Sequence, residues 1–287
     1  MEVLTEARNA SRRFGAFTAV SGVDLLVKRG EVVGLLGANG AGKTTLIRLL
    51  LGLLQPSDGL VRLFGSPPSL EGRRRVGYVP QTLGLYAGLT VAENWAFTAA
   101  AFRNVSTPIP ERIAAWKHEL AGSLPLGTQR QVAFALALSH EPELLVLDEP
   151  TSGVGPLGRA RLWEDIRYTA DRGSGLLVTT HNMEEAEQCD RLVVMADGKV
   201  VTSGTAAEII GGRKVTEVRC KDWSRAFRLL DANGFSVQGH GPALRVAASA
   251  ADVGGLISRE GLDATIEVVA ATLEEAFVAM VSTPAAA

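Results

Sequence analysis

Residues 37–45 read Gly37-Ala38-Asn39-Gly40-Ala41-Gly42-Lys43-Thr44-Thr45 and fit the pattern G-x-x-x-x-G-K-[ST]. The apolar run before them (32–36) is short enough for a buried strand, and the leucine-rich run after them (43–54) is long enough for a helix. Strand, loop and helix in this order form the context in which the pattern binds nucleotide phosphates. The glycines let backbone N–H groups turn inward, and the helix directs its positive end at the same anion. We therefore predict a phosphate site made by all nine residues, with Lys43 at the β- and γ-phosphates and the Thr44 hydroxyl on Mg²⁺.

The bulk composition narrows the class of protein. The chain has 287 residues, 46% of them hydrophobic and 21% charged, with a net charge of −2. This length suits one large domain or a domain with an appendage, and the absence of a basic excess argues against a nucleic-acid partner. The cysteines, Cys189 and Cys220, lack the spacing of a metal site, which suits a reducing compartment. No signal peptide and no membrane-spanning run is expected, so the sequence predicts a soluble, cytoplasmic chain.

A mostly parallel sheet is predicted from the apolar runs. Leu144–Leu147 is apolar at every position, which is typical of a central strand covered on both faces. Residues 23–28 alternate and predict an edge strand, and Asp197-Gly198 predicts a hairpin turn. Further strands are expected at 60–64, 76–79, 176–180, 192–195 and 199–202. The expected fold is α/β, a P-loop NTPase core with antiparallel edge strands.

A helical insert is predicted at about residues 82–142. Thr90 and Glu93 have the capping-box spacing and open a helix that runs to about Phe102. Pro110 opens a second helix, expected to reach Gly122 with Leu120 on its apolar face. A third helix, 128–139, is apolar on most sides and is expected to be buried.

A second domain is predicted beyond Gly211-Gly212. From 215 to 269 the patterns alternate in the order strand, helix, strand, strand, helix, strand. This order fits a small ferredoxin-like α+β unit. A last helix over 272–281 begins with another capping box, Thr272 and Glu275. We therefore divide the chain into residues 1–212 and 213–287.

Two acidic residues follow the central strand. Asp148 ends the apolar run, and this arrangement predicts a Walker B carboxylate that holds Mg²⁺ through water. Glu149 comes next and is a candidate general base for an attacking water. With a phosphate loop upstream, the pair predicts phosphoryl transfer.

The order of the remaining motifs resembles the ATP-binding-cassette (ABC) ATPases. Gln81 ends a strand, the helical insert follows, then Asp148-Glu149-Pro150-Thr151-Ser152-Gly153, and then His181. The resemblance runs from about Val3 to Gly211. Residues 179–191 resemble in particular the ATPase subunits of drug, daunorubicin and ABC-2-type exporters, and residues 272–277 are similar to the last helix of their C-terminal extensions.

The resemblance implies roles for single residues. Phe14 corresponds to the aromatic residue that stacks on adenine. Gln81 corresponds to the Q-loop residue, which touches Mg²⁺ and water and links the site to the membrane partner, and His181 corresponds to the switch histidine that senses the γ-phosphate. Residues 85–90 occupy the region that receives the coupling helix of the membrane subunit, although a core turn would be equally apolar. The other histidines match no motif: His118, His140 and His240.

The signature motif departs from the family. In place of Leu-Ser-Gly-Gly the chain reads Leu124-Pro125-Leu126-Gly127, a variant that also resembles the second cassette of some fused exporters. In the family this motif contacts the γ-phosphate bound to the opposite subunit. Pro125 offers neither a hydroxyl nor an N–H, while Gly127 and the helix N-terminus remain. The D-loop, the segment after the Walker B strand, has Gly155 where an aspartate is usual.

The resemblance implies a function and leaves alternatives. It implies an ATPase that binds ATP and Mg²⁺, dimerises head to tail with an identical or different cassette, and drives export through a separate permease at the inner face of the cell membrane. A soluble cassette ATPase of translation or DNA repair would carry a long coiled-coil insert or tandem cassettes, and neither is present in the sequence. A non-hydrolysing regulatory cassette is favoured by Pro125 and Leu126 and opposed by Glu149 and His181.

Overall fold

The chain forms two compact units, Met1–Thr205 and Ala206–Ala287, in a computed structural model that describes residues 2–102 and 108–282. The sequence-based boundary after Gly212 falls a few residues beyond this division. Within the described ranges, no helix has both the length and the apolar composition needed to cross a lipid bilayer.

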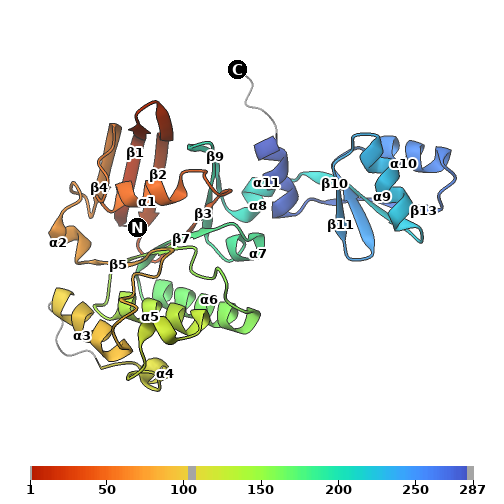
Figure 1. Cartoon of the computed structure of the whole chain (residues 1–287). Helices are drawn as coiled ribbons and strands as arrows, with labels where there is room; N and C mark the ends of the chain where they lie inside the picture. The colour runs from red at the N-terminus through yellow and green to blue at the C-terminus, as the bar shows by residue number, and fades with distance from the viewer. Residues whose placement is uncertain (1, 103–107, 283–287) are drawn as a thin grey trace. The chain divides into compact units, whose positions relative to one another are not determined.

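The first unit contains a six-stranded sheet in the order β5-β6-β7-β3-β8-β9. All neighbours pair in parallel except β8 and β9. Its strands are β3 (Val32–Leu36), β5 (Val76–Val79), β6 (Leu144–Asp148), β7 (Gly175–Thr180), β8 (Arg191–Ala196) and β9 (Lys199–Gly204). Every residue of β3, β6 and β7 is buried, because helices and a second sheet cover both faces. The predicted α/β fold with a mostly parallel sheet is confirmed (Figure 1).

A three-stranded antiparallel sheet, ordered β2-β1-β4, lies against the same core. Its strands are β1 (Val3–Phe14), β2 (Phe17–Lys28) and β4 (Asp58–Leu63). Helix α1 (Lys43–Leu50) buries Leu46, Ile47 and Leu49 in a cluster with residues of both sheets. This packing fixes the position of the helix that follows the phosphate loop. The helix expected over 43–54 is shorter than predicted, because α1 ends at Leu50.

The helical insert contains α3 (Val91–Phe102), α4 (Glu111–Ala114) and α5 (Leu126–Leu138). The capping box is confirmed: Glu93 Oε2 accepts from the Thr90 N–H at 2.7 Å, and Thr90 Oγ1 accepts from the Glu93 N–H at 3.2 Å. The helix expected over 110–122 begins as predicted, with Pro110 as the N-cap of α4, but it ends at Ala114. Backbone groups of the segment 117–121 pair instead with 89–92, for example the Val91 N–H with the Glu119 carbonyl at 3.0 Å. This pairing satisfies the first N–H groups of α3 and leaves Leu120 49% exposed.

The remaining elements of the first unit are short or link the sheet strands. They are α2 (Leu70–Arg73), the 3₁₀ turn η1 (Ala121–Ser123), α6 (Pro156–Asp171) and α7 (Met183–Ala186). The predicted hairpin between β8 and β9 is confirmed, and Asp197 and Gly198 both have positive φ, 48° and 75°, as a two-residue hairpin of this kind requires.

The second unit is a four-stranded antiparallel sheet in the order β11-β12-β10-β13. Helices α9 and α10 pack on one face through a cluster that includes Leu230, Ile257 and Val246. The elements are α8 (Ala206–Ile210), β10 (Lys214–Cys220), α9 (Trp223–Ala232), β11 (Val237–His240), β12 (Ala243–Val246), α10 (Ala250–Arg259), β13 (Ala264–Ala270) and α11 (Leu273–Ser282). The order and pairing match the predicted ferredoxin-like arrangement.

Candidate nucleotide site

The phosphate loop connects β3 to α1, and close packing explains two of its glycines. A Cβ on Gly37 would lie 2.5 Å from the Met195 carbonyl oxygen, and a Cβ on Gly42 would lie 2.5 Å from that of Ala19. Gly42 has φ +98° and is the N-cap of α1. No side chain caps this helix and its first turn holds no acidic residue, so its N-terminal N–H groups face the loop. This end of α1 suits a bound anion.

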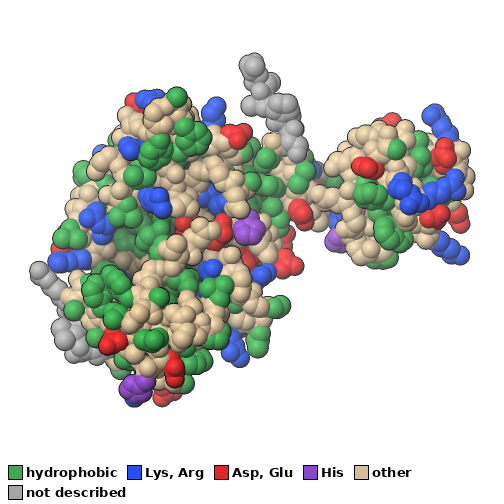
Figure 2. Space-filling model, viewed as in Figure 1, with side chains coloured by type: hydrophobic (Ala, Val, Ile, Leu, Met, Phe, Trp, Pro, Cys, Tyr) green, Lys and Arg blue, Asp and Glu red, His purple; other side chains and the backbone are tan. Residues whose placement is uncertain are grey.

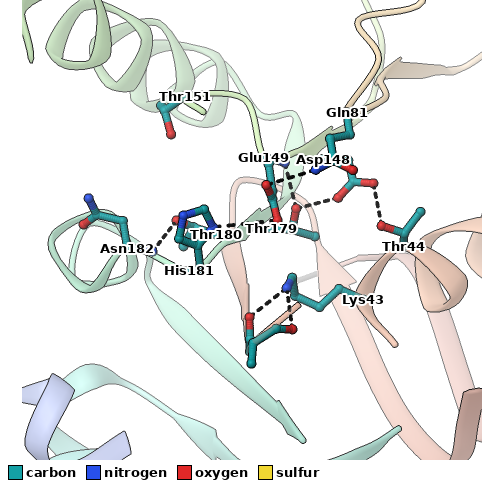
Figure 3. Close-up of polar contacts among 12 residues, drawn as sticks. Lys43, Thr44, Gln81, Asp148, Glu149, Thr151, Thr179, Thr180, His181 and Asn182 are labelled. Carbon is teal, nitrogen blue, oxygen red and sulfur yellow. Dashed lines mark hydrogen bonds and ion pairs between the residues drawn. The ribbon is translucent and has the colours of Figure 1, made fainter. Parts of the chain in front are cut away.

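Lys43 is folded back onto the loop and is only 5% exposed. Its Nζ donates to the carbonyls of Gly37 at 2.7 Å and Ala38 at 3.1 Å (Figure 3). Burial lowers the pKa of Lys43, and the nearby carboxylates of Glu149 and Asp148 act against this shift. The ammonium group is thus held inside the loop, where the phosphates of a nucleotide would lie.

Asp148 joins the phosphate loop to the ends of two strands. It is 2% exposed and ends β6. Its Oδ2 accepts from Thr44 Oγ1 at 2.9 Å, and its Oδ1 accepts from Thr179 Oγ1 at 2.7 Å. A hydroxyl and a carboxylate side by side are oxygen donors of the kind that Mg²⁺ takes when phosphates and waters complete its shell. The described residues contain no cluster of three or more His, Cys, Asp and Glu that could hold a metal by itself.

Glu149 is fixed through its backbone as well as its side chain. It has φ +52°, a conformation that non-glycine residues rarely adopt. Its N–H donates to Thr179 Oγ1 at 2.8 Å, and its carbonyl accepts from Arg130 Nη1 at 2.9 Å. These two hydrogen bonds hold the strained residue in place, so its carboxyl group projects from the end of β6 in one direction.

The Glu149 carboxyl group meets Gln81 and His181, to which the resemblance gives the Q-loop and switch roles. Gln81 Nε2 donates to Glu149 Oε2 at 3.3 Å, and His181 Nδ1 lies 3.7 Å from Glu149 Oε1 (Figure 3). Gln81 follows β5 and His181 follows β7, on either side of β6 in the sheet. The carboxyl ends of three neighbouring parallel strands thus gather Gln81, Asp148, Glu149 and His181 next to Lys43 and Thr44.

Phe14 and the signature residues lie outside this set of contacts. Phe14 ends β1 with a half-exposed ring, and the Arg12 guanidinium lies 4.7 Å from the ring centroid. Pro125 is the N-cap of α5, and Leu126 and Gly127 begin the helix. Gly155 is the N-cap of α6, with space where a Cβ would lie.

Sequence reasoning missed three side chains of this region. They are Arg130, Thr179 and Glu185, and the motifs described above assign a role to none of them. All three side chains are buried, with exposed fractions of 7% for Arg130, 0% for Thr179 and 2% for Glu185. Each side chain bonds to a residue of another segment, and no local sequence pattern reveals such a contact.

Known proteins resemble this chain over most of the first unit. The family model described as ABC transporter matches residues 20–152. The probable multidrug ABC transporter ATP-binding protein YbhF of Escherichia coli is 38% identical over 220 residues, which cover 72% of this chain. The match covers only 38% of YbhF, so this chain spans well under half of that protein. Nod factor export ATP-binding protein I of Burkholderia orbicola is 41% identical over 216 residues, 71% of each chain.

Solved structures of ABC transporter subunits have a fold similar to that of this chain. An ATP binding subunit of an ABC transporter superposes with a TM-score of 0.64 at 29% identity, covering 72% of this chain and 91% of that one. The fold of cbiO1 from Clostridium perfringens is also similar, with a TM-score of 0.62 at 24% identity over 80% of this chain and 95% of that one. The shared identity, the coverage of both chains and the geometry of the phosphate loop show that the chain belongs to the ABC transporter ATPase family.

Proposed function

We propose that this chain binds and hydrolyses ATP to drive export through a separate membrane permease. The observation that carries the proposal is the hydrogen bond from Thr44 to Asp148, at 2.9 Å, with Glu149 next in the chain. It brings the phosphate loop, the candidate metal carboxylate and the candidate base into one site. Phosphoryl transfer needs mainly such positioning and charge stabilisation.

Each residue of the site has its own role in binding or hydrolysis. Lys43 and the N–H groups at the start of α1 bind the β- and γ-phosphates, and Phe14 stacks on the adenine. Thr44, Gln81 and Asp148 are the candidate ligands of Mg²⁺, Asp148 through water. When bound, this ion neutralises phosphate charge. Glu149 takes the proton of the attacking water. His181 contacts the γ-phosphate and faces Glu149 from the neighbouring strand.

A docking surface for the permease is proposed around residues 85–90. The Tyr86 and Phe97 side chains are half exposed and meet edge to face, with ring centroids 4.8 Å apart. The buried Asn94 side chain anchors this loop by accepting from the Tyr86 N–H and donating to its carbonyl. Hydrophobic side chains gather on the face that carries α3 (Figure 2). An ordered apolar loop of this kind suits a helix supplied by a partner.

The assembly that we propose is a head-to-tail pair of cassettes on the inner face of the membrane. Residues 1–212 form the cassette and residues 213–287 an accessory domain. Pro125, Leu126 and Gly127 act at the nucleotide of the second cassette. Export is supported by the names of the relatives, one a multidrug transporter protein and one a Nod factor export protein. A regulatory, non-hydrolysing cassette is the second candidate, because Pro125 and Leu126 replace the usual signature.

Two measurements test the proposal. The purified chain should release phosphate from ATP in the presence of Mg²⁺, and chelation of the metal should stop the release. A tagged chain, recovered from detergent-extracted membranes, should copurify with a permease and a cassette, identical or different. Binding of ATP without turnover in that complex would favour the regulatory cassette. Recovery with ribosomes or DNA-repair proteins in place of a permease would contradict the transport function.

A further inference from the structure

Glu185 is a buried carboxyl group outside the catalytic set described above. It lies in α7 and is 2% exposed. Burying such a group is unfavourable unless its oxygens are paired and hydrogen-bonded. Thr151 Oγ1 donates to Oε1 at 2.6 Å, and Thr180 Oγ1 donates to Oε2 at 2.7 Å. Arg159 Nε lies 3.3 Å from Oε1 and supplies a positive charge.

The two threonines belong to the segments that carry the catalytic pair. Thr151 lies two residues after Glu149, and Thr180 directly precedes His181. Thr180 Oγ1 also accepts from the Asn182 N–H at 3.0 Å, so the same hydroxyl shapes the turn that holds the histidine (Figure 3). One carboxyl group therefore joins the chain after Glu149 to the chain around His181.

Glu185 and the catalytic pair line the same small cavity. Its volume is about 120 Å³, and its lining includes Glu149, His181, Glu185 and both threonines. The hydrogen bonds from Thr151 and Thr180 to Glu185 therefore connect two segments that line this cavity; we call this pair of hydrogen bonds the clamp. It acts in addition to the 3.7 Å approach of His181 Nδ1 to Glu149 Oε1.

We propose that Glu185 is a positioning residue for ATP hydrolysis, an inference that rests on the proposed function. By holding Thr151 and Thr180, it sets the separation of Glu149 and His181. A misplacement of about 1 Å at a reacting group can lower a rate by about 100-fold. Among the residues that the structure describes, the Glu185 carboxyl group bonds to Thr151, Thr180 and Arg159 and to no residue of the phosphate loop. Its loss should therefore lower kcat and leave the KM for ATP nearly unchanged.

The variant Glu185→Gln tests the role, and Glu184→Gln is its matched control. Glu184 is exposed on the same short helix, so the control removes the same charge without touching the clamp. We expect Glu185→Gln to lower kcat per ATP-binding site by roughly 10- to 100-fold with KM within about twofold. Counting sites by ATP binding separates slow turnover from loss of folded protein. Thr180→Val should reproduce part of the loss and add little in the Glu185→Gln background.

A second measurement needs no turnover. The chain has four histidines, so the His181 imidazole resonance can be assigned by NMR with His181→Ala. This resonance should move in Glu185→Gln and stay in place in Glu184→Gln. Loss of hydrolysis in every variant, wild type included, would count against the proposed function, and the resonance would still decide the role of Glu185. A folded Glu185→Gln protein with an unmoved resonance, or with wild-type kcat, would overturn the inference.

Discussion

The side chain of Leu126 packs directly on the backbone of Gly153. A Cβ on Gly153 would lie 2.7 Å from Leu126 Cδ2, and Gly153 has φ +74°. This contact links the altered signature at the start of α5 to the D-loop that follows Glu149. It also gives Leu126, which stands where the family has glycine, a partner within its own chain.

Gly153→Ala should destabilise the first unit. The positive φ is unfavourable for alanine, and residues held in such conformations typically cost about 1–3 kcal/mol. The new methyl group also meets Leu126, so Leu126→Ala should restore part of the stability. Urea unfolding of the single and double variants measures both effects. Gly155→Ala is the control, because it has φ −66° and open space at its Cβ. Equal losses for the two glycine variants would contradict the packing described.

Lys43→Ala should abolish most ATP hydrolysis. It removes the ammonium group that the loop holds beside the predicted phosphate position. Losing one preorganised charge-stabilising group of this kind typically costs about 3–4 kcal/mol in the transition state, or at least about 100-fold in rate. Steady-state phosphate release measures the effect. Lys199→Ala, an exposed lysine of β9, should hydrolyse ATP like wild type. Wild-type turnover by Lys43→Ala would contradict the phosphate-loop assignment.

Glu149→Gln should bind ATP and fail to hydrolyse it. The amide cannot accept the proton of the attacking water, and a general base contributes about 10²–10⁴-fold. The variant also removes a negative charge near the γ-phosphate, so an ATP-bound dimer should persist in size-exclusion chromatography with Mg²⁺. Glu164→Gln, exposed on α6, controls for a change of charge alone. A Glu149→Gln protein that turns over ATP at the wild-type rate would remove Glu149 from the mechanism.

The ion pairs of Glu143, which directly precedes β6, predict that the stability of the first unit depends on pH. Hydrogen bonds from Arg75, at 2.6 Å, and from Arg29 lower the pKa of Glu143 from 4.5 to about 2. Because the folded pKa is depressed, this stabilisation is present above about pH 4.5 and is lost as the pH falls toward 2. The difference in unfolding free energy between wild type and Glu143→Gln should thus be constant near neutrality and shrink in that window.

Urea unfolding at a series of pH values measures this difference. Glu141→Gln, at an exposed neighbouring position, should match wild type throughout. A gap between wild type and Glu143→Gln that is the same at pH 7 and pH 3 would show that the two arginines do not hold the carboxylate as described.

Much of the fold could be predicted because its signals are local. The apolar run of β6, the hairpin at Asp197 and Gly198, and both capping boxes each lie within a few residues, and all are confirmed. Strand β1 was missed because its sequence is polar and its pairing with β2 is irregular. It is held by neighbours on both sides, which no local pattern reveals.

Some residues of the candidate site could likewise be predicted from the sequence, and others could not. Motif residues such as Lys43 and Asp148 could be named from spacing alone, and their contacts agree with a common site. Arg130 and Glu185 could not be named in this way, because their partners lie on other elements. Arg130 bonds to Glu149, and Glu185 bonds to Thr151 and Thr180. The catalytic roles themselves stay predictions until the variants above are measured.

The altered signature gives the last prediction. In a dimer, Pro125 and Leu126 would face the nucleotide of the second cassette, while Glu149 acts on this chain's own. A homodimer would then have two slow sites, and a heterodimer one fast and one slow site. The Leu-Pro-Leu-Gly variant still offers Gly127 and the N-terminus of α5, a 13-residue helix, to a phosphate.

The double variant Pro125→Ser and Leu126→Gly tests whether the altered signature slows turnover in either assembly. The serine regains a hydroxyl and an N–H, and each good transition-state donor contributes up to about 3 kcal/mol, so kcat should rise several-fold in the purified transporter. The single variants are the controls: Pro125→Ser supplies the donors, whereas Leu126→Gly only removes the contact with Gly153 and should not raise kcat. A correctly folded double variant with unchanged or lower turnover would mean that Gly127 and the helix N-terminus already suffice. The regulatory, non-hydrolysing alternative would then lose the one observation that favours it.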